Sequence, residues 1–256
     1  MGRVCGNPLP APDLDRRYLV LALGAAAVSV SAGVLASVAT DSPPRLPGEV
    51  AGIRLPDSPL AVAAVSLARG ACPAFLFNHC LRTFLFGALL AERDQVSYDR
   101  EMIFVAAALH DLGLTRSYAR AQQPFEVDGA DAAKAFLVSR GVSEVRAEMV
   151  WNSIALHTSM LVEHYPPQVA LVGDGAGADV FGSQLGELPR ERVRAVFGAF
   201  PRLSFNTQFR DLLVDHCHRK PFAQHGTWLD GFCRQHNPAL QYPDLESRLL
   251  SARVGE

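Results

Sequence analysis

This sequence lacks an excess of positive or negative charge. The 256 residues include 24 Lys and Arg and 26 Asp and Glu, which gives a formal net charge of -2, and no run of like charges occurs. Proteins that bind nucleic acids neutralise phosphate groups with a basic face. We therefore expect no nucleic-acid partner, and we expect a small-molecule ligand instead.

Alternating Val- and Ile-rich runs and internal repeats are also missing, which argues against a sheet-based or repeat architecture. Helical periodicity begins at Ser58 and Pro59, a capping residue followed by Pro at the first helical position. We predict an all-α fold. Its helices are expected at 60–71, from about 73 to 89, at 99–112, 127–140 and 143–157, in the segment from Pro166 to Asp179, at 189–199, 206–218 and 226–235, and near the end.

The N-terminal region has the pattern of a targeting signal. Arg16 and Arg17 precede an uncharged, Ala-rich stretch that ends in Ser37-Val38-Ala39, a sequence that a signal peptidase accepts. We predict that residues 1–39 are a twin-arginine signal peptide or an N-terminal anchor. This makes export to the periplasm or medium by the twin-arginine (Tat) machinery the expected route, with a cytoplasmic protein as the alternative.

Proline is concentrated just after this stretch, since residues 41–59 hold five prolines and two glycines. Such a composition is typical of a linker or an extended segment. We assign 40–58 to a Pro-rich linker and 59–256 to the helical domain.

Cysteine pairs with metal-binding spacing are absent, because the five cysteines form no CxxC motif. A domain of this size does not need disulfides to fold. We expect the four cysteines after the signal segment to be small buried thiols. They are Cys72, Cys80, Cys217 and Cys233.

A candidate metal site stands out among the helices. His110 and Asp111 end an otherwise apolar helix, where an ionised carboxylate is costly to bury without a partner or a cation. His79, among apolar residues, and Asp179, in a Gly-rich run, are the further candidate ligands. Alone, His79 could be a satisfied core histidine and Asp179 a cap or turn residue. Together the four donors suit zinc, manganese or iron.

The residues around these ligands form five short sequence motifs, which follow one another along the chain. They are Phe77-Asn78-His79-Cys80-Leu81-Arg82, His110-Asp111-Leu112-Gly113, Phe125-Glu126-Val127-Asp128-Gly129-Ala130-Asp131-Ala132-Ala133, Ile154-Ala155-Leu156-His157-Thr158 and Gly177-Ala178-Asp179-Val180-Phe181-Gly182. The set resembles the HD superfamily of metal-dependent hydrolases and, within it, the cyanamide hydratase-like branch, over about residues 55–225. The fold implied is an HD-domain bundle of about eight to ten helices.

The resemblance implies one divalent metal ion, usually zinc in that branch, with iron or manganese as alternatives, held by His79, His110, Asp111 and Asp179. A water activated by the metal would attack a nitrile-like carbon. The chain departs from the branch at Cys80, where Ser is common, and in its export signal.

Further roles are predicted for the neighbours of these ligands. With Asp111, Glu126 and His157 are the candidate catalytic residues, although Glu126 could instead be a first-turn carboxylate and His157 a structural histidine. Arg82 and Asn78 are the candidate substrate-binding residues, with an ion pair to a helix carboxylate as the alternative for Arg82.

Three alternatives to the hydratase remain at this stage. An HD phosphohydrolase would act on a nucleotide or phosphoester, but Lys and Arg are not clustered near the motifs. A di-iron oxygenase would need His157 and His164 as further ligands. A non-catalytic domain would use the metal only for stability and bind a ligand.

Overall fold

The predicted all-α fold is confirmed by the computed structural model, which describes residues 45–120, 123–161, 164–242 and 245–252. The predicted signal peptide at 1–39 lies outside the described residues. In chain order the described α-helices are α1 (Pro59–Ala71), α2 (Ala74–Arg93), α3 (Arg100–Leu109), α4 (Phe125–Val138), α5 (Glu144–Ala155), α6 (Pro167–Phe181), α7 (Arg190–Ala199), α8 (Phe205–Arg219), α9 (Asp230–His236) and α10 (Leu245–Ser251), with short 3₁₀ helices η1 (Leu112–Leu114) and η3 (Leu185–Glu187).

The first helices begin where the sequence predicts. The Ser58 hydroxyl accepts a hydrogen bond from the Ala61 amide at 3.1 Å, and the Asp99 carboxylate accepts one from the Met102 amide at 3.2 Å. Each bond satisfies a backbone N–H that the first turn of a helix leaves without a partner. Helix α3 ends earlier than predicted, at Leu109, so His110 and Asp111 stand in the turn between α3 and η1.

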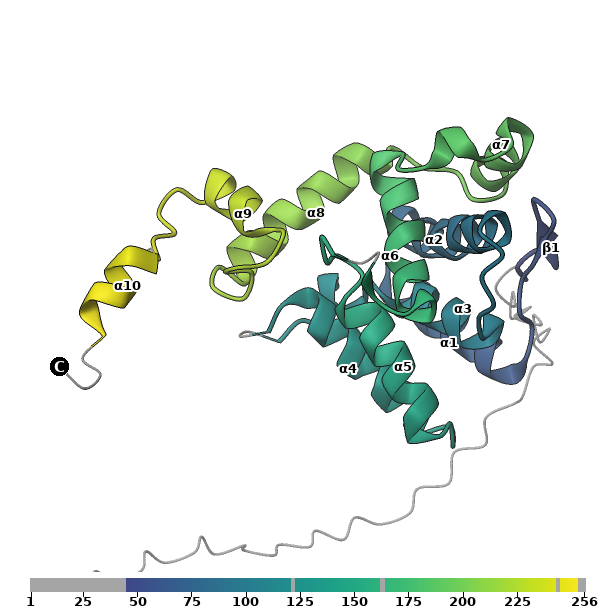
Figure 1. Ribbon diagram of the computed structural model, residues 1–256, viewed down its shortest axis with the longest axis horizontal. Coiled ribbons are helices and arrows are strands. Elements are labelled where there is room, and N and C mark those ends of the chain that lie inside the picture. Colours follow the sequence, from purple (N-terminus) through teal and green to yellow (C-terminus); the bar gives the residue numbers. More distant parts are fainter. Residues whose placement is uncertain (1–44, 121–122, 162–163, 243–244, 253–256) are drawn as a thin grey trace, which may run out of the picture. The chain divides into compact units, whose positions relative to one another are not determined.

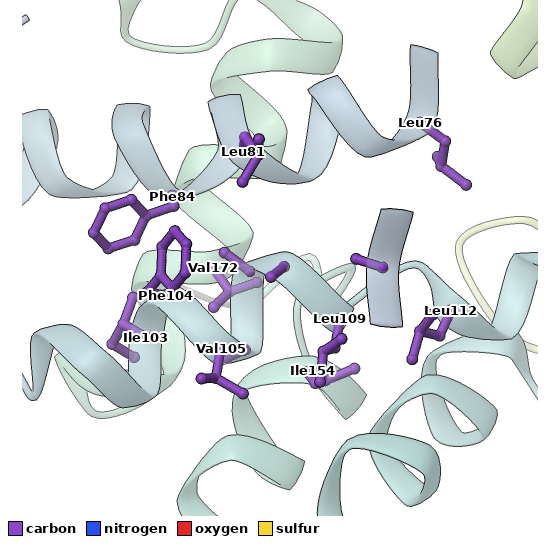
Figure 2. Close-up of a cluster of buried hydrophobic side chains, with 14 of the residues drawn as sticks. Leu76, Leu81, Phe84, Ile103, Phe104, Val105, Leu109, Leu112, Ile154 and Val172 are labelled. Carbon is purple, nitrogen blue, oxygen red and sulfur yellow. The ribbon is translucent and has the colours of Figure 1, made fainter. Parts of the chain in front are cut away.

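Helix α2 lies at the centre of the core. It has the length and apolar composition of a membrane-spanning helix, yet 89% of its most apolar window is buried within the domain. It packs mainly against α6 and also contacts α3, while α4 packs against α5 (Figure 1). Figure 2 shows side chains from several helices in this region, among them Phe84 and Phe104. Their rings pack edge to face, with the ring centroids 5.0 Å apart.

Helices α2 and α6 approach each other so closely that only glycine fits between them. A Cβ atom on Gly175 would lie 2.0 Å from the Thr83 carbonyl oxygen, and one on Gly87 would lie 2.5 Å from the Leu171 carbonyl oxygen. The Gly-rich run before Asp179 is therefore helical, not a turn. Its glycines are tolerated there because tertiary packing outweighs their low helix propensity.

Gly113 has a similar role after the His-Asp pair. A Cβ atom at this position would lie 2.0 Å from the Phe125 carbonyl oxygen. Its backbone is not in the left-handed region, so the glycine is explained by this close approach.

The described part of the predicted linker packs against the domain. Strands β1 (Glu49–Val50) and β2 (Ile53–Arg54) form a short antiparallel hairpin, with Val50 paired to Ile53. Val50, Ile53 and Leu55 are buried in the core. Alternation over two residues is too short a pattern to predict a strand.

Two of the cysteines differ from the prediction. Cys217 in α8 and Cys233 in α9 form a disulfide, whereas Cys72 and Cys80 are free and buried as expected. The sequence could not reveal this pairing, because the turns after α8 bring the two Cα atoms within 5.1 Å across a separation of 16 residues.

The contact between α2 and α6 predicts the effect of one added methyl group. We expect Gly175→Ala to lower the free energy of unfolding by about 1–3 kcal/mol, because its Cβ meets backbone that cannot rotate away. Gly177→Ala is the matched control, since the nearest atom to its Cβ would be the Ser183 hydroxyl at 3.8 Å. Urea unfolding of both variants provides the measurement, and equal stabilities would contradict this account of the helix contact.

Candidate metal centre and cavity

Three of the four predicted metal ligands come together in the structure. His79 on α2, His110 at the end of α3 and Asp111 after it offer ligand atoms that all lie within 4.8 Å of one another. The Oδ2 atom of Asp111 is 3.5 Å from Nε2 of His79 and 3.3 Å from Nε2 of His110. All three side chains are buried. Two imidazole nitrogens and a carboxylate at this spacing can bind a metal ion.

Backbone carbonyl groups determine which histidine nitrogens face the cluster. Nδ1 of His110 lies 2.8 Å from the Ala107 carbonyl oxygen, and Nδ1 of His157 lies 2.6 Å from that of Ile154. A carbonyl only accepts, so both Nδ1 atoms carry the proton, and each Nε2 keeps a free lone pair. His157 turns its Nε2 toward Asp111 as well, 4.0 Å from Oδ1.

Burial keeps these histidines neutral. Burial and the neighbouring His79 lower the pKa of His110 to about 3. Burial and the neighbouring His110 lower the pKa of His157 to about 3. Burial raises the pKa of Asp111, because it disfavours the ionised carboxylate. The imidazoles are thus in the form that metals bind.

The cluster contains buried polar atoms without hydrogen-bond partners. Among the described residues these include Nε2 of His110 and Oδ2 of Asp111, which face each other. Unpaired buried atoms of this kind are costly, and a bound cation would satisfy both of them. The donor set therefore fits a divalent metal ion held by His79, His110 and Asp111.

Asp179, the fourth predicted ligand, adjoins the cluster through His79. It is a buried residue of α6, and its Oδ2 accepts a hydrogen bond from Nδ1 of His79 at 2.7 Å. Burial alone would raise its pKa, but the hydrogen bonds from His79 and Arg82 lower the pKa well below the usual range of a carboxyl. Asp179 is therefore ionised and orients His79, so that Nε2 of His79 faces Asp111.

Arg82 and Asn78, the residues expected to bind substrate, both make hydrogen bonds within the protein. The guanidinium of Arg82 is fully buried and donates to both oxygens of Asp179 at 2.7 Å and to the carbonyl oxygens of Phe200 and Pro201. Asn78 donates to the Pro201 carbonyl at 2.9 Å. The alternative given for Arg82, an ion pair with a helix carboxylate, is therefore the contact observed, while substrate binding by the two residues stays a prediction.

Glu126 has the environment of a proton-transfer group. Its Oε1 accepts hydrogen bonds from the Thr158 hydroxyl and from Nε1 of Trp228, both at 2.8 Å, while Oε2 is buried and has no partner among the described residues. Burial raises the pKa of Glu126, and the nearby charge of Asp111 acts in the same direction. A carboxyl with a raised pKa can exchange a proton closer to neutral pH.

The sequence did not single out Thr158 or Trp228 as partners of Glu126. Thr158 ends one of the five sequence motifs, but Trp228 lies 102 residues from Glu126 in the chain. No local pattern signals a contact over that separation, because it depends on how the segment after α8 folds back.

A cavity of about 380 Å³ opens over the cluster. His79, His110, Asp111 and His157 line it, together with Phe125, Thr158, Phe209, Trp228 and one side of α6. Among the described residues that line the cavity, none is Lys or Arg. His164, which a di-iron centre would need, is exposed and does not line it.

The comparison with protein families agrees with this geometry. Residues 76–191 match the family model of the HD domain. The match supports a relationship between this chain and the HD-domain superfamily. It spans α2 to the start of α7 and so includes every residue of the cluster. HD domains are generally metal-dependent hydrolases. No curated protein matches the chain.

We expect the purified protein to contain about one divalent metal ion per chain and His110→Ala to lose it, because His110 supplies a neutral, unpaired Nε2 atom. Elemental analysis of both proteins measures this. The exposed His218→Ala serves as the control for a general effect of losing a histidine. Equal metal content in His110→Ala and the wild type would show that the metal binds elsewhere.

Proposed function

We propose that this protein is a metal-dependent hydratase, or a closely related hydrolase, that adds water to a nitrile-like carbon of a small uncharged substrate. One observation carries the proposal: the unpaired Nε2 of His110 and Oδ2 of Asp111 face each other beside a cavity whose described lining residues include no Lys or Arg. The first half of that observation supports a metal ion, and the second supports a substrate without a phosphate.

The side chains divide the work between them. A divalent metal held by His79, His110 and Asp111 would supply Lewis acidity and lower the pKa of a water molecule. Glu126 would take a proton from the attacking water through its free Oε2 and return one to the substrate nitrogen. Hydration of a nitrile to an amide consumes one water and moves two protons from oxygen to nitrogen, so a group that both accepts and donates is needed.

The HD phosphohydrolase is the second candidate and has less support. Enzymes that bind phosphate esters favour Arg or Lys beside the phosphate. Arg82 was the candidate for this contact, but Asp179 and backbone carbonyl groups take up its donors. Only the metal would then face the phosphate.

We expect the metal-loaded protein to convert cyanamide to urea, or a simple nitrile to its amide, and Glu126→Gln to lower kcat by about 10²–10⁴-fold. Amide and urea formation are measured directly, after reconstitution with zinc, manganese or iron. Glu148→Gln, which removes a charge from an exposed carboxylate paired with Lys134, is the matched control.

The same preparation is tested on nucleotides and phosphoesters. Phosphate release without amide formation would replace the hydratase by a phosphohydrolase. A metal-loaded protein that turns over neither class would be a non-catalytic binding domain.

We also propose that the protein is exported. The disulfide between Cys217 and Cys233 supports this, because such bonds persist mainly in oxidising compartments. The twin arginines and the Ser37-Val38-Ala39 sequence give an independent reason from a different part of the chain.

For export we expect a mature N-terminus just after Ala39 and an intact Cys217–Cys233 bond in the wild type. Replacing Arg16 and Arg17 with Lys should keep the protein in the cytoplasm with both thiols reduced, because the twin-arginine route would no longer accept it. N-terminal sequencing and peptide mapping without reductant test both points. An uncleaved cytoplasmic wild type with reduced thiols would overturn export.

A further inference from the structure

We propose that the cavity is shaped for a substrate with an aromatic or branched aliphatic group and that Gly177 sets the size of that group. The proposal rests on the proposed function for the reacting group of the substrate, and on the walls of the cavity for the rest. The cavity is also the place where the buried, unpaired atoms of His110 and Asp111 lie.

One face of α6 borders the cavity with mostly small residues. Gly173, Ala176, Gly177 and Val180 all line the cavity, and their spacing of three, four and seven residues places them on one side of a helix. Leu171, Gly175 and Asp179 follow each other at intervals of four on another side, where they contact α2. The two faces have separate tasks, since one packs and the other borders open volume.

Packing does not explain the glycine at position 177. A Cβ atom there would meet only Ser183, at 3.8 and 3.9 Å, whereas one on Gly175 would collide with α2. Glycine inside a helix costs about 1 kcal/mol relative to alanine. The glycine leaves volume in the cavity, since any larger side chain at this position would extend into it.

The volume exceeds what the smallest nitriles need. A molecule of three heavy atoms such as cyanamide takes up on the order of 100 Å³ or less, judged from ~30 Å³ for a water. The cavity measures about 380 Å³. The remainder suits an organic group about the size of a phenyl ring.

The chemistry of the walls indicates what that group is. Phe125, Phe209, Trp228 and Phe181 line the cavity with aromatic rings, and Met160 adds a thioether. Phe181 and Met160 are 73% and 86% exposed, although side chains of this kind usually avoid water. None of the described lining residues is Lys or Arg, so an anionic group would find no cationic side chain among them. An uncharged aromatic or branched nitrile matches these surroundings.

The test measures binding separately from turnover. The chain has two tryptophans, so Trp151→Phe leaves Trp228, in the cavity wall, as the fluorescent reporter. Metal-loaded protein in this background is titrated with phenylacetonitrile and with benzyl alcohol, an aromatic probe without a nitrile. Amide formation from phenylacetonitrile and urea formation from cyanamide are followed in parallel.

We expect both aromatic probes to change the Trp228 emission with saturation. Gly177→Leu should weaken their binding by about tenfold or more, because its side chain fills the space that the ring would occupy. Cyanamide turnover is measured in the same variant, and its loss should be smaller than the loss of phenylacetonitrile turnover, since a small substrate needs less of the space. Gly198→Leu is the matched control, because Gly198 lies on the exposed face of α7 with no atom within 4 Å of its Cβ.

The outcomes separate the two proposals. Saturable aromatic binding that Gly177→Leu weakens, without any amide or urea formation, would support the cavity assignment and overturn the hydratase. Cyanamide turnover without aromatic binding would support the hydratase and overturn the cavity assignment. Aromatic binding that is equally strong in Gly177→Leu would overturn the role of Gly177.

Discussion

The buried ion pair between Arg82 and Asp179 is the interaction on which the site depends. Both side chains are excluded from water, and two hydrogen bonds of 2.7 Å join them. Breaking such a pair by removing one partner costs about 3–5 kcal/mol, because it leaves an uncompensated buried charge. Arg82 shares α2 with His79, so the same carboxylate holds both residues. The rotation of α2 against α6 and the direction of His79 are thereby fixed together.

Backbone contacts set the other distances in the site. Gly113 lies against the Phe125 carbonyl group, and a Cβ atom on Gly129 would lie 2.7 Å from the carbonyl oxygen of His110. These approaches hold the start of α4 against the turn that contains Asp111. Glu126 therefore reaches the neighbourhood of the metal ligands through main-chain packing, and its own hydrogen bonds with Thr158 and Trp228 then fix its side chain.

The sequence predicted the helices well because their signals are local. Caps such as Ser58 and Asp99 and the apolar spacing of α2 need no knowledge of distant residues. His79, His110 and Asp111 were also predicted, since a buried His-Asp pair requires a compensating partner. The place of Asp179, the task of Arg82, the Cys217–Cys233 bond and the contact of Glu126 with Trp228 could not be settled this way. Each depends on which side of a helix meets which neighbour.

The division of α6 into two faces has a consequence for how this protein can change over evolutionary time. Gly175 and Asp179 are constrained by α2, so a replacement at either position disturbs the helix that carries His79. Gly173, Ala176 and Gly177 line the cavity, and a Cβ atom on Gly177 would lie near Ser183 and not against α2. One helix thus keeps the reactive centre constant while its other side can vary, and a lineage could acquire new substrates in single steps without losing its chemistry.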